Sequence, residues 1–156
     1  MMGEVKIREG GLDDSRVVAL LTSHLDLMRS QSPPESVHAL DLDALRTPDI
    51  AFLTAWDSDT LLGCGALKRL DAGHGEVKSM HTVAAARRRG VGRLLLQRIE
   101  AIARADGLTR LSLETGSPDG FAAGRALYAK EGFVECPPFA DYAEDPFSVF
   151  MTKRLG

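Results

Sequence analysis

The stretch 75–107 constrains the fold more than any other part of the chain, because it joins three segments of different periodicity. Residues 76–83 alternate apolar or β-branched side chains with polar ones, which is typical of a strand with two differently used faces. From Val91 onward apolar side chains recur at helical spacing, and Gly107 is suited to end the helix. We therefore expect a strand, a loop and a helix in immediate succession.

The loop between that strand and that helix is rich in arginine and glycine. Gly90 and Gly92 leave the unpaired N–H groups of the first helical turn open to a bulky anion, and the helix dipole favours negative charge there. The Walker phosphate loop does not fit, because Arg93 replaces its lysine, and the dinucleotide fingerprint does not fit, because Leu95 replaces its third glycine. The loop is thus predicted to bind a phosphate-bearing ligand of another class.

The rest of the chain predicts an antiparallel first half followed by a parallel crossover. Strand patterns occur at residues 4–8, 49–57, 61–70 and 76–83, then again at 110–115, 133–136 and 148–153. Helices are expected near residues 17–28, 41–46, 91–106 and 121–131. Because strand 110–115 follows a crossover helix, it is expected to run parallel to strand 76–83, and parallel strands that splay leave a cleft.

Three motifs in this order resemble the GCN5-related N-acetyltransferase (GNAT) family, and in particular its uncharacterised small bacterial members. Arg87-x-x-Gly90-x-Gly92 matches the family's R/Q-x-x-G-x-G/A signature, residues 111–115 look like its fifth strand, and residues 126–133 look like its A-L-Y-x-x-x-G-F segment. The resemblance implies one domain, residues 1–156, of the α/β (α+β) class. The implied fold is a mixed sheet of six to seven strands, antiparallel in its first half, with strands 4 and 5 parallel and splayed and about four flanking helices.

The resemblance also implies that acetyl-coenzyme A is the cosubstrate and that no metal takes part. In relatives the backbone before the glycine loop binds the pantetheine arm and polarises the thioester carbonyl, which by register assigns this role to Met80, His81 and Thr82. The family's pyrophosphate loop corresponds here to Arg87, Arg88, Arg89, Gly90, Val91, Gly92 and Arg93. Two positions depart from the common pattern, since Ala84 stands for a proline and Phe121 for an asparagine.

Acetyl transfer to an amine needs a base, stabilisation of an oxyanion and a proton for the leaving thiolate. Tyr128 matches the family's tyrosine near the coenzyme sulfur, and a phenol of pKa about 10 can protonate a thiolate. Glu114 and Glu76 match the base positions of different relatives, and the sequence leaves open which of them, or a water relay, serves. Each carboxylate is also suited to hold an ammonium substrate by charge.

Two segments are candidates for acceptor binding. Residues 30–38 form a polar, proline-rich loop that corresponds to the region covering the acceptor site in relatives, and Ser32 and His38 are its candidate contacts. The segment 139–142 should hang over the acceptor end of the cleft, where Asp141 and Tyr142 would suit a small amine. For both segments, a role as plain surface connector is the alternative.

Composition narrows the class of function. A formal charge of −3 argues against a general nucleic-acid or membrane-surface partner, and the run at 87–89 has no aromatic side chains beside it. No stretch has the apolar length of a membrane span, and we expect a cytoplasmic protein. Our hypothesis is direct acetyl transfer from acetyl-coenzyme A to a primary amine of a small molecule or peptide. A catalytically silent coenzyme A-binding regulatory module is the alternative, and a homodimer is among the oligomeric states left open.

Overall fold

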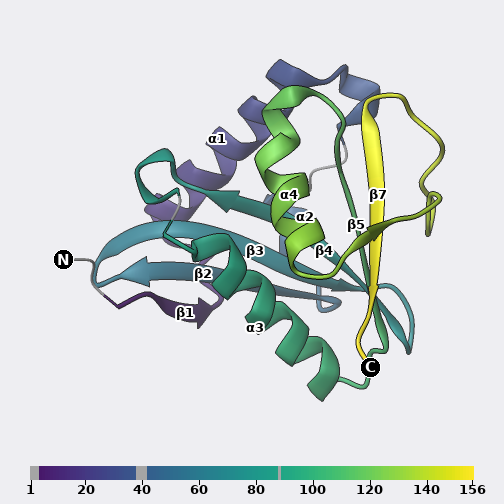
Figure 1. The fold of residues 1–156 in the computed structure, drawn as a ribbon. Coiled ribbons are helices and arrows are strands. Elements are labelled where there is room, and N and C mark those ends of the chain that lie inside the picture. Colours follow the sequence, from purple (N-terminus) through teal and green to yellow (C-terminus); the bar gives the residue numbers. More distant parts are fainter. Residues whose placement is uncertain (1–3, 38–41, 88) are drawn as a thin grey trace.

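The computed structural model describes residues 4–37, 42–87 and 89–156, which form a twisted sheet with helices on both faces (Figure 1). The strands are β1 (Lys6–Glu9), β2 (Ile50–Asp57), β3 (Thr60–Arg69), β4 (His74–Thr82), β5 (Arg110–Gly116), β6 (Val134–Glu135) and β7 (Ser148–Arg154). The α-helices are α1 (Ser15–Gln31), α2 (Leu42–Leu45), α3 (Val91–Ala105) and α4 (Ala122–Lys130). Short 3-10 turns are η1 (Pro34–Ser36), η2 (Ala84–Ala86) and η3 (Asp119–Phe121). Across the described ranges, every helix is too short or too polar to cross a membrane.

The described strands form one mixed sheet in the order β1-β2-β3-β4-β5-β7-β6. Strands β1 to β4 pair antiparallel, β4 and β5 pair parallel, and β7 runs antiparallel to both β5 and β6. The predicted architecture is therefore confirmed, including the parallel crossover through α3. This order places the glycine loop at the end of β4, next to the end of β5.

Strands β4 and β5 part soon after they meet. Their pairing covers His74–Arg110, Gly75–Leu111 and Glu76–Ser112. From there β4 continues to Thr82 along β3, whereas β5 continues to Gly116 along β7. The sheet is therefore open between the second halves of these two strands, as the splayed-strand prediction requires.

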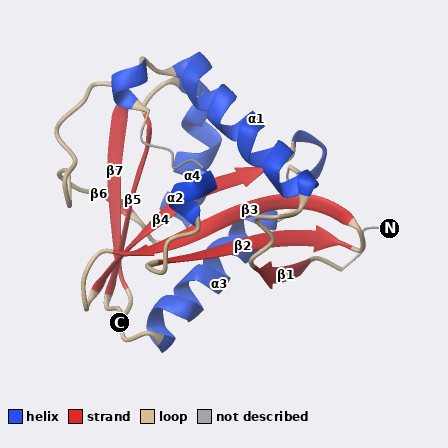
Figure 2. Ribbon diagram, turned by 180° about the vertical axis from the view of Figure 1, so that it is seen from behind, coloured by secondary structure: helices blue, strands red, loops and turns tan. Residues whose placement is uncertain are grey.

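The two faces of the sheet are buried by different helices. On one face, α3 contributes Val91, Leu95, Leu96, Ile99 and Ala103 to a core that also includes Tyr128 of α4. On the other face, α1 and α2 pack on β2 and β3 through Val17, Leu20, Leu21 and Leu45. Figure 2 shows this second face, with α1 lying across the strands. The apolar spacing of each helix thus predicts its buried side.

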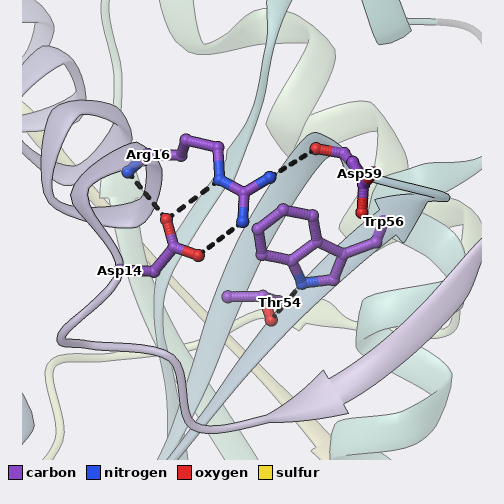
Figure 3. A network of polar contacts seen from close by, with 5 residues as sticks. All are labelled: Asp14, Arg16, Thr54, Trp56 and Asp59. Carbon is purple, nitrogen blue, oxygen red and sulfur yellow. Dashed lines mark hydrogen bonds and ion pairs between the residues drawn. The ribbon is translucent and has the colours of Figure 1, made fainter.

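A polar network fixes the start of α1 on the sheet (Figure 3). The Asp14 carboxylate accepts from the Arg16 main-chain N–H at 2.9 Å and from the Arg16 guanidinium at 2.7 and 3.0 Å. The same guanidinium donates to the Asp59 carbonyl at 2.6 Å and lies 4.6 Å from the centre of the Trp56 ring. Through these contacts, the helix N-terminus is held on the β2–β3 hairpin, which orients the rest of α1 over β4.

Candidate active site

A cavity of about 640 Å³ lies where β4 and β5 part. Its wall contains the C-terminal half of α1, η1, the end of β4, the glycine loop, the end of β5, and residues of α4. The residues predicted as site residues that line it are Ser32, Met80, His81, Thr82, Arg87, Gly90, Val91, Gly92, Arg93, Glu114 and Tyr128. One cavity thus joins most of the residues expected to bind cofactor with two of the three expected to catalyse.

The glycine loop forms an open helix N-terminus on this wall. Gly90 is the N-cap of α3 in a left-handed conformation, with φ of 78°, and its residue type supplies no capping side chain. The first α3 hydrogen bond runs from the Leu94 N–H to the Gly90 carbonyl at 3.0 Å, so it does not use the N–H groups of residues 91–93. A Cβ at Gly92 would come within 2.9 Å of Leu127 Cδ2, so this position has little room for a side chain. The geometry suits an anion such as a pyrophosphate.

The arginines of this loop are placed differently. Arg87 and Arg93 line the cavity. Arg89 forms an ion pair with Asp57 at 3.1 Å and is not among the cavity residues. Arg88 lies outside the described residues. Two of the cations expected near a pyrophosphate are therefore at the cavity wall.

Strand β4 contains a bulge that changes which side of the sheet its later side chains point to. Ser79 has φ of 56°, and the register with β3 shifts between the partners of Cys64 and Ala66. After the bulge, the Met80 side chain packs on the α3 side of the sheet. A Cβ atom added to Gly65 on that side would lie 2.5 Å from the Met80 Sδ. His81 faces α1 instead. Simple alternation, which puts His81 on the face of Val77, is wrong here because the bulge adds a residue.

His81 meets a histidine from α1 at the cavity. The Nδ1 atoms of His24 and His81 lie 3.3 Å apart, and both residues line the cavity. Burial lowers the pKa of His24 to about 4, with a further contribution from His81, and burial also lowers the pKa of His81. Both rings are therefore neutral at pH 7, so one Nδ1 donates and the other accepts. The sequence places His24 on the buried stripe of α1, but its partner is 57 residues away.

Glu114 is the carboxyl group on the cavity wall near the end of β5. Burial raises the pKa of Glu114 to about 7, whereas the nearby Ser148 hydroxyl and the charge of Lys78 act in the opposite direction. Tyr128 lines the same cavity from α4, and burial together with the charge of Glu114 raises its pKa. The site thus contains a carboxyl group that titrates near neutral pH and a phenol that stays protonated.

Glu76 lies elsewhere, on the α1 side of β4 and outside the cavity lining. It is 3% exposed, and its Oε2 accepts hydrogen bonds from Lys78 at 3.1 Å and from the Tyr142 hydroxyl at 2.5 Å. Lys78 also donates to the Tyr142 oxygen at 2.9 Å and lines the cavity. The carboxylate is therefore engaged by a cation and a phenol, and it fixes Lys78 and the loop that carries Tyr142.

Some of the residues predicted to bind the acceptor line the cavity, and others do not. Ser32 lines the cavity, Asp141 is exposed, and His38 lies outside the described residues. Ser36 and Phe147 line the cavity although the sequence did not single them out. The sequence indicates these two residues only by their position, since each lies in a proline-containing segment beside the predicted acceptor residues.

Comparison with known proteins agrees with this geometry. The family model described as the acetyltransferase (GNAT) family matches residues 17–133, and the chain belongs to this family. It is therefore an acetyltransferase.

The relatives extend over almost the whole chain. The uncharacterised N-acetyltransferase YsnE of Bacillus subtilis (strain 168) is 54% identical over 96% of this chain and 99% of its own. An IAA acetyltransferase of Azospirillum brasilense is 47% identical over 95% of each chain. The crystal structure of PaiA N-acetyltransferase from Thermoplasma acidophilum in complex with coenzyme A shares the fold, with a TM-score of 0.74 at 18% identity over 97% of this chain and 99% of its own.

Proposed function

We propose that this protein transfers the acetyl group of acetyl-coenzyme A directly to a primary amine of a small molecule or peptide. The family supports acetyl transfer, and the Thermoplasma relative of the same fold was crystallised with coenzyme A. The residues present fit that cosubstrate, because the open N–H groups of α3 and the side chains of Arg87 and Arg93 would receive its pyrophosphate.

The observation that carries the proposal is a desolvated carboxyl group on the wall of this same cavity. With a pKa of about 7, Glu114 is ionised in about half of the molecules at neutral pH, so it can accept a proton from an ammonium group. Glu76 is less suited, because its carboxylate already accepts from Lys78 and Tyr142.

The reaction then needs no covalent enzyme intermediate. Glu114 takes one proton from the ammonium group, the neutral nitrogen attacks the thioester carbonyl carbon, and the new C–N bond replaces the C–S bond. The thiolate leaves with the proton of Tyr128, which lines the cavity, and the second proton lost by the nitrogen restores the phenol. Main-chain N–H groups of residues 80–82 are the candidates for stabilising the oxyanion.

The test is a panel of primary amines with acetyl-coenzyme A, in which released thiol and acetylated product are both measured. IAA, the compound in the name of the Azospirillum relative, is tested separately from the amines. We expect amine-dependent thiol release with one acetyl group on the product. Tight coenzyme binding without turnover of any amine would instead identify a silent regulatory module.

A further inference from the structure

A buried lysine lies across the opening of the sheet from the candidate base. The last pair of the β4–β5 ladder joins Glu76 to Ser112. Lys78 and Glu114 are each two residues further along their strands, so they hold equivalent positions just past the point where the strands part. Paired residues point to the same side of a sheet, as do residues two apart in a strand. The Lys78 and Glu114 side chains therefore leave the sheet on one side, and both residues line the cavity.

Lys78 has one N–H donor to spare. Its side chain is 8% exposed, and its ammonium group donates to Glu76 Oε2 at 3.1 Å and to the Tyr142 oxygen at 2.9 Å. An ammonium group has three N–H donors, and no hydrogen bond to a described residue uses the third. A buried donor without a partner lowers stability. A ligand in the cavity that Lys78 lines would supply that partner.

The next residue in the chain adds a second unused polar group. Ser79 is 8% exposed and lines the cavity, and its Oγ atom has no hydrogen-bond partner within the part of the chain that the structure describes. Buried hydroxyl groups are usually hydrogen-bonded, so this atom also indicates a ligand. An ammonium N–H and a hydroxyl on adjacent residues suit the two oxygens of one carboxylate.

The charged groups of the cavity wall separate by position. Among the described lining residues, Glu114 is the one carboxyl group, and the cations are Lys78, Arg87 and Arg93. The two arginines belong to the glycine loop, where the proposed pyrophosphate binds. Lys78 is therefore the cation that remains for the acceptor, and no ion pair between described residues joins it to Glu114. A ligand with an ammonium and a carboxylate of its own would complement both side chains.

We propose that the acceptor is a free amino acid, whose carboxylate binds Lys78 and the Ser79 hydroxyl while its amine meets Glu114. This inference rests on the proposed acetyl transfer, which it narrows from primary amines to amines that carry a carboxylate. Paired strands lie about 4.8 Å apart, and two residues past the last pair the gap has only begun to widen. The two charges of the ligand must therefore be close together, as in an α- or β-amino acid.

The experiment compares kcat/KM for α- and β-amino acids with kcat/KM for their primary amides, which keep the amine and the shape without the carboxylate charge. Lys78→Met keeps the length of the side chain and removes its charge. It should lower the ratio of acid to amide about ten- to a hundredfold relative to wild type, the worth of a hydrogen bond between charged groups. Lys78→Arg keeps the charge and should keep the preference for the acid. Ser79→Ala should lower the ratio by a smaller factor.

The change of this ratio between variants is the readout, because acid and amide also differ in the basicity of their amines. The matched control is Lys6→Met on the exposed strand β1, which removes the same charge away from the cavity and should leave the ratio unchanged.

If Lys78→Met does not fold because the buried Glu76 loses its cation, the double variant Glu76→Gln/Lys78→Met removes both charges, and the same fall is expected. An unchanged ratio in folded, active Lys78 variants overturns the amino-acid inference alone. Absence of turnover with every amine in wild type overturns the proposed function and this inference with it.

Discussion

At the scale of single residues, Glu114 should determine the pH range in which the enzyme is active. Its pKa of about 7 places the active, ionised form on the alkaline side of neutrality. As pH rises through 7 the proton leaves Glu114, so kcat/KM should rise about tenfold per pH unit below pH 7 and level above it.

Glu114→Gln keeps the shape of the side chain and removes the base. We expect kcat/KM to fall about 10²- to 10⁴-fold at pH 7, with recovery at high pH as the free amine form of the substrate increases. Glu135→Gln on the exposed strand β6 is the matched control and should retain wild-type kinetics. A wild-type pH profile in Glu114→Gln would assign the base to another group.

The Tyr128→Phe variant removes only the phenolic hydroxyl and so tests its role. Burial and the charge of Glu114 raise the pKa of Tyr128, so its phenol stays protonated at neutral pH and is available as a donor. Tyr128→Phe should lower turnover about 10²- to 10⁴-fold while the ring still packs at the edge of Phe133. An acetyl donor with a more acidic thiol needs less protonation and should narrow this deficit. Near-wild-type turnover would make Tyr128 a packing residue.

At the scale of elements, the sequence predicts most of the fold because each element has a local signal. The helix after the glycine loop was expected to end near Asp106 and Gly107, and α3 ends at Ala105. The bulge in β4 has no such signal, since serine is an ordinary strand residue and its positive φ arises from pairing with β3. Local alternation therefore fails for the half of β4 that lines the cavity.

The candidate site is less predictable than the fold because its contacts join distant residues. Motif spacing predicts the glycine loop, Tyr128 and Glu114, all of which the cavity brings together. The hydrogen bond between Tyr142 and Glu76 spans 66 residues, and the hydrogen bond between Ser36 and Asp145 spans 109. Tertiary packing decides such contacts, and it also places Glu76, one of the candidate bases, in an ion pair with Lys78.

The connection 136–147 contains a residue that is strained in its backbone, and this gives a stability prediction. Ala140 is exposed and has φ of 50°, a left-handed conformation that costs a residue with a Cβ about 1 kcal/mol. Ala140→Gly should therefore raise the free energy of unfolding by up to about 1 kcal/mol. Ala101→Gly, at an exposed position inside α3, is the matched control and should lower it by about 1 kcal/mol. Denaturant unfolding at pH 7 measures both, and a loss in Ala140→Gly would contradict the prediction.

At the scale of the whole molecule, two parts of the sheet meet around one cavity and share one hydrophobic core. The β4–β5 ladder pairs three positions, and the Lys153–Glu100 ion pair at 2.7 Å links β7 to α3. The hydrogen bonds from Ser36 to Asp145 and from Tyr142 to Glu76 also join segments of the two parts. A ligand that contacts both parts adds to these links.

Acetyl-coenzyme A should accordingly stabilise the protein against heat. A ligand that binds only the folded state contributes about 2.7 kcal/mol at one hundred times its dissociation constant. Gly92→Ala places a Cβ at the loop and should reduce this stabilisation, whereas Gly73→Ala, where a Cβ meets Thr109 Oγ1 at an ordinary 3.5 Å, should keep it. Thermal scans with and without the ligand measure the difference. Equal shifts in wild type and Gly92→Ala would place the ligand elsewhere.

The early end of the β4–β5 ladder also affects how this chain is compared with its relatives. In the described chain, parallel pairing stops at Glu76, so on the side away from β3 residues 77–82 border the cavity and not β5. When main-chain groups hold a ligand, its binding affinity depends little on the side chains of the same residues. Under the proposed function, substitutions at Met80 or Thr82 among homologues are therefore poor evidence of a change in cosubstrate, whereas those at Gly92 are informative.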